Sequence, residues 1–318
     1  MTRISKNISE AVTILKSNDV VAIPTETVYG LAGNIYSQKA IKKIFEVKQR
    51  PFFNPLIVHV HSMAQVDELV SEFPPEAKKL ATTFWPGSLT LILPKKDTVP
   101  DIITAGKNSV AIRMPNHPTT LSLLKALNTP LAAPSANPFN RISPTTAQHV
   151  KEYFNNCIPL VLDGGPCKNG IESTIIGFEN NTAVVYRFGA ISIEDIEAVI
   201  GKVQIKTTSK TTPNAPGMLA KHYAPKTKTY LSNNLEDFIQ SHPNKRIGVI
   251  CFKNPLSNQH VAHTEVLSAT GNLKEAAAKL YQTLHKLDTL NLDIIVAERL
   301  PDVGLGKSVN DRLERATK

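Results

Sequence analysis

Short apolar runs alternate with helical patterns along the first two thirds of this chain. Residues 38–48 carry apolar side chains at helical spacing, which predicts an amphipathic helix there. Prolines at the start of residues 74–85 suit the first turn of another helix. The apolar runs predict strands at residues 20–23, 56–60, 89–93, 110–113, 130–133, 159–163, 173–178 and 182–187.

The pattern changes after residue 201. Residues 206–216 are rich in Thr, Ser, Lys and Pro and have no apolar periodicity, which indicates a linker. Beyond it, residues 246–252 and 293–297 read as strands, and residues 273–287 as a strongly amphipathic helix. Continuous apolar strands mixed with helices are typical of a buried mixed sheet, so we predict an α/β fold. We expect a catalytic domain over 1–201, a linker or lid over 202–225 and a smaller α/β domain over 226–318.

Composition narrows the class of protein. The chain has 318 residues, 42% of them hydrophobic and 20% charged, which is ordinary for a soluble protein. Its apolar runs are shorter than the about 18 residues of a membrane span, and residues 1–9 lack the apolar core of a secretory signal. The cysteines at 157, 167 and 251 are scattered and odd in number. They predict free thiols in a reducing cytoplasm. From the short apolar runs, we expect no membrane contact.

The charge balance is basic. Lys and Arg number 36 against 27 Asp and Glu, a formal net charge of +9. Such a surplus favours polyanionic partners, and we expect it to permit direct contact with RNA. A generic basic surface explains the charge equally well, because there is no Arg-rich tail, RNP-type aromatic motif or zinc finger.

The common catalytic signatures are missing. The sequence has no P-loop, no G-x-G-x-x-G and no G-x-S-x-G. Histidines and carboxylates do not recur at metal-ligand spacing either, so we predict no protein-held metal site.

Polar residues instead gather at the ends of predicted strands. Lys48, Arg50 and Asn54 precede the strand that contains His59, and Ser135 follows another apolar run. Polar groups at strand ends, with prolines restricting the backbone, are typical of an anion site in an α/β protein. Because these clusters are far apart in sequence, we expect one pocket assembled from several loops.

Two arginines strengthen this interpretation. Arg113 and Arg187 each end an apolar strand, a position that is usually buried. A buried arginine is costly unless it pairs with an anion. With Lys48 and Arg50, these arginines could neutralise a triphosphate and a carboxylate.

Each of these residues also has a purely structural interpretation. Arg113 or Arg187 could pair with Asp163 or Glu172, and His59 could be a hydrogen-bonded core histidine. Several other polar residues could cap helices or shape turns: Thr25, Thr27, Ser135 and Asn137.

A set of motifs appears in this order: PTETVYGL, KQRPFFNPLIVHV, WPGSLTLIL, AIRMP, PSAN, RISPT, GIESTI and YRFG. Together they resemble the YrdC-like domain. Residues 216–218 (PGM), 222–225 (HYAP) and 308–316 (SVNDRLERA) extend the resemblance to the long, two-domain form of the threonylcarbamoyl-AMP synthase family. It covers nearly the whole chain. It implies a twisted mixed-sheet YrdC-like domain with a basic cavity, followed by a smaller Rossmann-like α/β domain.

The resemblance also implies a reaction. L-threonine, bicarbonate and ATP would give threonylcarbamoyl-adenylate and pyrophosphate, with Mg²⁺ held mainly by the ATP phosphates. A tRNA threonylcarbamoyl transferase would then modify the tRNA adenosine beside the anticodon. The threonine amine must form a carbamate that attacks the α-phosphorus in line. This chemistry needs positioning and charge neutralisation rather than a covalent nucleophile.

Site residues follow motif by motif from the resemblance. Threonine would be held by Thr27, His59, Arg113, Ser135 and Ser173, with Arg113 pairing its carboxylate. ATP would be held by Arg50, Asn54, Ser109, Ser135, Asn137, Ser143, Thr145 and Arg187, with Tyr223 as a lid. The catalytic pair near the phosphates would be Lys48 and Arg50. The sequence departs from the family pattern at Gln49, where glycine is common.

Two other functions compete with the synthase. One is a non-catalytic RNA-binding protein that uses the same basic cavity. The other is a carbamoyl-transfer module of the kind found inside larger hydrogenase-maturation proteins. The acylphosphatase and zinc-finger segments of those proteins are missing here, which favours the synthase.

Overall fold

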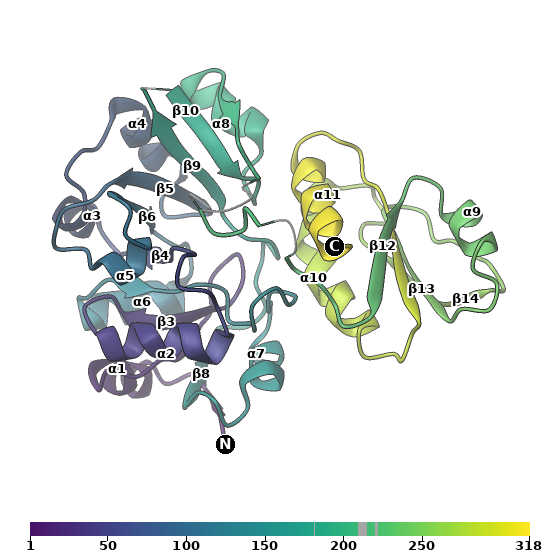
Figure 1. Ribbon diagram of the computed structural model, residues 1–318, viewed down its shortest axis with the longest axis horizontal. Helices are drawn as coiled ribbons and strands as arrows, with labels where there is room; N and C mark the ends of the chain where they lie inside the picture. Colours follow the sequence, from purple (N-terminus) through teal and green to yellow (C-terminus); the bar gives the residue numbers. More distant parts are fainter. Residues whose placement is uncertain (181, 209–214, 220–221) are drawn as a thin grey trace.

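The computed structural model describes residues 1–180, 182–208, 215–219 and 222–318 (Figure 1). Parts of the predicted linker and lid, residues 209–214 and 220–221, lie outside the described residues. We call the part up to strand β11 (Gln204–Ile205) the first unit and the part from strand β12 (Lys228–Ser232) onward the second unit. Figure 1 shows them side by side, with the C-terminal helix α11 (Leu305–Ala316) on the side of the second unit that faces the first.

The first unit is built on a mixed sheet of eleven strands. Its order is β1-β8-β2-β3-β7-β4-β6-β5-β9-β10-β11, with parallel pairs such as β4–β6 and antiparallel pairs such as β5–β6. The predicted mixed sheet is thereby confirmed. The strands are β1 Arg3–Ser5, β2 Val21–Ile23, β3 Gly30–Asn34, β4 Ile57–His59, β5 Leu89–Pro94, β6 Ser109–Arg113, β7 Leu131–Ala132, β8 Leu160–Leu162, β9 Thr174–Glu179, β10 Thr182–Arg187 and β11 Gln204–Ile205.

Helices cover this sheet. They are α1 Ile8–Lys16, α2 Gln38–Lys48, α3 Met63–Leu69, α4 Pro75–Phe84, α5 Asp101–Thr104, α6 Pro118–Leu127, α7 Ala147–Phe154 and α8 Ile193–Ile200. Helix α2 matters most for the site. It begins where the Ser37 side chain accepts a hydrogen bond from the Ala40 N–H, and it ends at Gln49, whose φ of 52° is left-handed. Glycine adopts this conformation without cost, so Gln49 occupies a backbone position that favours glycine.

Strand β3 was not predicted from the sequence. Its residues, Gly-Leu-Ala-Gly-Asn, include no β-branched side chain. A Cβ on Gly30 would lie 3.1 Å from the Ala133 Cβ, and one on Gly33 would lie 3.1 Å from the Ile44 Cδ1. Close approach of β7 and α2 therefore accounts for the glycines, and these neighbours are distant in sequence.

The second unit has a fully parallel four-stranded sheet in the order β12-β15-β13-β14. Helices α10 and α11 lie between this sheet and the first unit, and α9 lies on its other side (Figure 1). The elements are β12 Lys228–Ser232, α9 Leu235–Gln240, β13 Ile247–Cys251, β14 Val261–Val266, α10 Leu273–Leu287, β15 Ile294–Glu298 and α11 Leu305–Ala316.

Apolar packing joins the two units. One buried cluster combines Val28 and Ile171 of the first unit with Tyr281 and Leu284 of α10. The loops that carry Val28 and Ile171 also carry predicted site residues, so the second unit packs directly behind the site. Across the described parts of the chain, every helix is too short or too polar to cross a membrane.

Candidate active site

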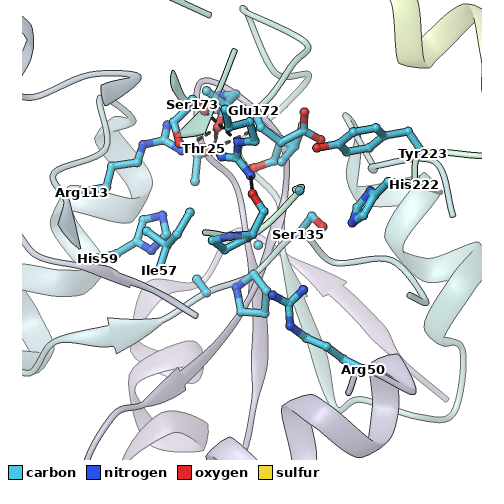
Figure 2. A pocket seen from close by; sticks show the side chains of 18 residues that line it. Thr25, Arg50, Ile57, His59, Arg113, Ser135, Glu172, Ser173, His222 and Tyr223 are labelled. Carbon is cyan, nitrogen blue, oxygen red and sulfur yellow. Dashed lines mark hydrogen bonds between the residues drawn. The ribbon is translucent and has the colours of Figure 1, made fainter. Parts of the chain in front are cut away.

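Segments between residues 25 and 223 line one pocket, and the space between its lining atoms is about 560 Å³ when the solvent open to the outside is included. Figure 2 shows His59 and Arg113 on one side, His222 and Tyr223 on the opposite side, and Arg50 below them. The predicted residues that line it are Thr27, Arg50, His59, Arg113, Ser135, Ser173, Arg187 and Tyr223. The pocket thus draws on loops after α2, β6, β7 and β10, as the separated motifs predict.

Three other predicted residues lie buried just outside the lining. The Ser143 Oγ donates to the Glu172 Oε1 at 2.6 Å, and the Thr145 Oγ1 lies 3.4 Å from the His149 Nδ1. The Asn137 amide donates to two backbone carbonyls of its own loop. These contacts hold the loops that frame the pocket.

Asn54 differs from those three residues. Its side chain is fully buried, and neither its Oδ1 nor its Nδ2 has a partner among the described residues. A buried amide without partners costs free energy. Asn54 does not line the pocket, but its backbone carbonyl accepts a bond from the Arg50 Nε at 3.3 Å.

Ser109 does not reach this pocket. It begins β6 while Arg113 ends the same strand, so the two residues lie roughly 13 Å apart. Ser109 instead lines a separate cavity together with Pro94 and Phe178. The prediction that Ser109 contacts ATP therefore conflicts with its place in the sheet, and we leave Ser109 out of the proposed site.

Lys48 lies behind the pocket floor. It is 1% exposed, and its Nζ donates to the Ser135 and Asn137 carbonyls, both at 2.5 Å. Burial, and then the charge of Arg50, hold the pKa of Lys48 well below its usual value. Through these two hydrogen bonds, Lys48 links the K-x-R motif (residues 48–50) to the S-x-N motif (residues 135–137).

Arg50 and Arg187 are buried and face the pocket. The Arg50 guanidinium donates to the Pro55 carbonyl at 2.8 Å, and the Arg187 Nε donates to the Ser173 carbonyl at 3.0 Å. Burial, followed by the charge of Arg187, lowers the pKa of Arg50 to about 9. Within the described residues, neither arginine forms an ion pair with a carboxylate. Burial lowers the pKa of Arg187, and the charges of Tyr223 and Glu172 offset this only in part. Two buried like charges without an ion-pair partner favour an anionic ligand.

Arg113 is neutralised within the protein. Its guanidinium lies 2.6 Å from the Glu26 Oε1 and donates to the Thr27 Oγ1 at 2.8 Å. Although burial raises the pKa of Glu26, Arg113 more than offsets this, and the pKa is lowered. The structural alternatives named from the sequence, Asp163 and Glu172, are therefore wrong for Arg113. Glu26 belongs to the PTETVYGL motif but was not predicted as a site residue.

His59 and Ser173 complete this side of the pocket. His59 is buried, and its Nδ1 has no partner among the described residues. Burial, and then Arg113, lower the pKa of His59 to about 3, so the imidazole is neutral at neutral pH. The Ser173 Oγ lies 2.7 Å from the Thr90 Oγ1 and accepts a bond from Arg187 at 3.0 Å.

Glu172 has its counter-charge in the second unit. Its carboxylate lies 3.1 Å from the Arg312 guanidinium of α11 and accepts bonds from Tyr281 at 3.0 Å. The sequence offered Glu172 as a structural partner of Arg113 or Arg187. Among the described residues it forms its ion pair with Arg312 instead, so that interpretation is wrong.

The described parts of the predicted lid close the pocket. Tyr223 is 1% exposed, has a left-handed φ of 63° and packs against His222 with ring centroids 4.1 Å apart. Gly217 has a φ of +86°, and a Cβ there would lie 2.8 Å from both the Arg187 Cδ and the Tyr223 Oη. Gly217 and His222 belong to the PGM and HYAP motifs but were not predicted as site residues, because only tertiary contact reveals their role.

No group of three or more His, Cys, Asp or Glu that could hold a metal ion occurs within the described ranges.

Two protein families match the chain in succession. The Sua5, YciO and YrdC family, described as telomere recombination, matches residues 13–189. The threonylcarbamoyl-AMP synthase C-terminal domain matches residues 191–317.

Individual relatives match over nearly the full length. The threonylcarbamoyl-AMP synthase of Bacillus subtilis is 39% identical over 319 residues, covering 97% of this chain and 92% of that protein. That of Pyrococcus abyssi is 39% identical over 317 residues, covering 95% and 92%. The crystal structure of P. abyssi Sua5 complexed with L-threonine has a TM-score of 0.92 and 37% identity, covering 100% of this chain and 97% of that chain. The chain therefore belongs to the Sua5, YciO and YrdC family, in the two-domain form that carries the threonylcarbamoyl-AMP synthase C-terminal domain.

Proposed function

We propose that this protein is an L-threonylcarbamoyladenylate synthase. It converts L-threonine, bicarbonate and ATP into threonylcarbamoyl-AMP and pyrophosphate. The observation that carries the proposal is the set of buried cations around one pocket, Lys48, Arg50 and Arg187, which have no carboxylate partner among the described residues. The full-length relatives named for this activity support the same reaction.

Threonine occupies the side of the pocket formed by His59 and Arg113. The Arg113 guanidinium pairs with the threonine carboxylate while it keeps its contact with Glu26. Thr27 and Ser173 line the same region and offer hydroxyls to the substrate. A relative crystallised with L-threonine supports this substrate.

ATP occupies the side formed by Arg50, Arg187 and the lid residue Tyr223. Its phosphates neutralise the two arginines, with Lys48 supporting the S-x-N loop from behind. The hydroxyl of Ser135 supplies a further hydrogen bond, and the backbone carbonyl of Asn54 supports Arg50. Ser143, Thr145 and Asn137 shape the surrounding loops.

The residues present act through position and charge. The threonine ammonium group first loses a proton, and the neutral amine attacks the bicarbonate carbon. One C–O bond of bicarbonate breaks, and its hydroxyl leaves as water with a second proton from the nitrogen, which gives a carbamate. A carbamate oxygen then attacks the α-phosphorus, and the bond from that phosphorus to the bridging oxygen breaks, which releases pyrophosphate. Fixed guanidinium groups stabilise charge that develops on the phosphates, which is a large term in a pocket that excludes water. Neutral His59 lies close to Arg113 and is suited to accept a hydrogen bond from the substrate amine or hydroxyl.

Mg²⁺ enters with ATP in this proposal. It neutralises phosphate charge and is held mainly by phosphate oxygens and water, the mode of binding that Mg²⁺ prefers in nucleotide enzymes. The product serves a transferase that modifies the tRNA adenosine beside the anticodon.

The test is pyrophosphate release from ATP with bicarbonate and Mg²⁺, measured with and without L-threonine. We expect release that depends on L-threonine and is absent with L-alanine, and loss of release in Arg50→Gln. If release does not depend on threonine, the synthase is excluded. If RNA binding that weakens steeply with salt is found in place of release, a binding protein is indicated.

A further inference from the structure

We propose that Arg312, on the last helix of the second unit, is a positioning residue for the reaction. It holds the Glu172 carboxylate away from Arg187, so that Arg187 stays available to the phosphates of ATP. This inference rests on the proposed function, since it concerns the same pocket. It gives the second unit a defined role in building the site.

The Glu172 carboxylate is saturated by groups from both units. Its Oε1 accepts a bond from the Ser143 Oγ at 2.6 Å, and the Tyr281 hydroxyl lies 3.0 Å from both oxygens. The Arg312 Nε and one terminal nitrogen each lie 3.1 Å from the Oε2. Arg312 is 0% exposed and Glu172 is 5% exposed. This is a buried, multiply bonded ion pair between α11 and the loop before β9.

Arg187 is the alternative partner of the same carboxylate. It binds the backbone carbonyl and the hydroxyl of Ser173, the residue that follows Glu172. Arg312, and then Arg187, hold the pKa of Glu172 down against the effect of burial. Two buried cations therefore compete for one carboxylate. In the structure Arg312 forms the ion pair, and Arg187 is left with oxygen acceptors that carry no full charge.

Loss of Arg312 would change the charge of the pocket. A buried carboxylate without its partner is strongly unfavourable, and the nearest remaining cation is Arg187. A Glu172–Arg187 pair would remove one of the positive charges that face the pocket. Because Glu172 already lines the pocket, its carboxylate without Arg312 would also repel phosphate oxygens bound there, which costs affinity. Threonine binding depends on Arg113 and Glu26, which form their own pair and would be affected less.

The experiment compares Arg312→Met, which keeps length but removes charge, with the double variant Arg312→Met/Glu172→Gln. ATP affinity is measured by titration calorimetry without threonine or bicarbonate, and KM values by pyrophosphate release. We expect Arg312→Met to weaken ATP binding about ten- to a hundredfold, in line with the loss of a charge-assisted contact. The KM for threonine should change much less. The double variant should recover most of the ATP affinity, and Arg312→Lys should lie between Arg312→Met and the wild type.

Arg315→Met is the matched control. Arg315 is also a buried arginine of α11, and it shares Asp311 with Arg312, but its other bonds go to the Leu219 and Thr207 carbonyls rather than to Glu172. Glu172→Gln should not rescue any defect of Arg315→Met.

Several results would overturn the inference. One is loss of ATP affinity in Arg312→Met that Glu172→Gln does not rescue, which indicates a structural role. Another is an equal rise in the KM for both substrates. If Arg312→Met does not fold, the comparison of the double variant and Arg312→Lys with the wild type decides, because a neutral buried pair is tolerated. If the wild type binds ATP but shows no threonine-dependent release, the proposed function fails while calorimetry still tests the pairing.

Discussion

At the scale of single residues, the buried arginines of the pocket differ in what neutralises them. Arg113 pairs with Glu26, whereas Arg187 contacts oxygens of Ser173 and Pro216. In the proposed function, a carboxylate substrate at Arg113 would join an existing ion pair, and a phosphate at Arg187 would give that arginine its first ion pair. The two halves of the pocket therefore suit anions of different charge density.

Arg113→Gln separates the structural pair from the substrate contact. Leaving Glu26 buried without its partner should lower the free energy of unfolding by about 3–5 kcal/mol. The double variant Arg113→Gln/Glu26→Gln should recover most of that stability, yet both variants should need more threonine because the carboxylate contact is lost. Denaturant unfolding and the two KM values measure these effects. A larger rise in the KM for ATP than for threonine would reassign Arg113.

His285 links stability to pH. Its Nε2 lies 3.1 Å from the Ser143 carbonyl, and its ring stacks on His149 with centroids 3.9 Å apart. Burial, and then His149, lower the pKa of His285 to about 4. The unfolded chain, with a histidine pKa of about 6.5, therefore binds more protons between pH 6.5 and 4. The free energy of unfolding should fall as pH falls through this window, by up to about 1.4 kcal/mol per pH unit for this group.

His285→Gln checks the assignment, because glutamine can still donate to the carbonyl but does not titrate. Its unfolding free energy, measured in denaturant at several pH values from 7.5 to 4.5, should depend less on pH than that of the wild type. Identical pH dependence in both proteins would show that His285 is not the titrating group.

At the scale of elements, the described ends of the lid segment are held from two sides. The Tyr223 ring lies 5.3 Å from the Arg312 guanidinium of α11, and the Pro216 carbonyl accepts a bond from Arg187 at 3.4 Å. The segment therefore connects the second unit to the phosphate side of the pocket. Within this segment, Gly217 lies so near Arg187 and Tyr223 that a Cβ there would be 2.8 Å from each side chain.

Gly217→Ala should raise the KM for ATP. A Cβ at a φ of +86° is strained by roughly 1–2 kcal/mol, and it would also collide with Arg187 and Tyr223. Gly201→Ala is the control, because Gly201 also has a positive φ, +79°, but open space around it. The control should lose stability without a change in KM. Equal kinetics for both variants would show that the lid segment does not need this close approach.

An element was predictable from the sequence when the pattern that specifies it lies within its own residues. Helices α2 and α10 and strand β10 were predicted to the residue, because their periodicity lies within their own sequence. Strand β3 was missed because its glycines are explained by close contact with Ala133 and Ile44, which lie outside the strand. An element whose composition is set by its neighbours has no local signal.

The site shows the same limit. The cations at strand ends were predictable, because a charged residue that closes an apolar run is a local pattern. Their partners were not: Arg113 meets Glu26 across 87 residues, and Arg312 meets Glu172 across 140. Ser109 shares a strand with Arg113, but strand length separates the two. These ion pairs and distances depend on the tertiary fold, so the local sequence does not predict them.

At the scale of the whole molecule, Arg50 and Arg187 have no ion-pair partner among the described residues, so the free energy of unfolding should depend on bound anions. ATP should raise the free energy of unfolding by about 2.7 kcal/mol at a concentration one hundred times its Kd. Sodium chloride of equal ionic strength should give a much smaller effect. In the double variant Arg50→Gln/Arg187→Gln the ATP effect should largely disappear. An equal response to sodium chloride and ATP in the wild type would indicate general screening and not a specific site.

The Glu172–Arg312 ion pair has a consequence for how this protein can change over evolution. Its two members lie in different units, so a lineage that loses the second unit also loses the counter-charge of Glu172. A relative made of the first unit alone should therefore carry a neutral residue at the position of Glu172, or gain a cation beside it from the first unit. Gene fission and substitution at this position should then occur together, and an alignment of one-unit and two-unit relatives would reveal that covariation.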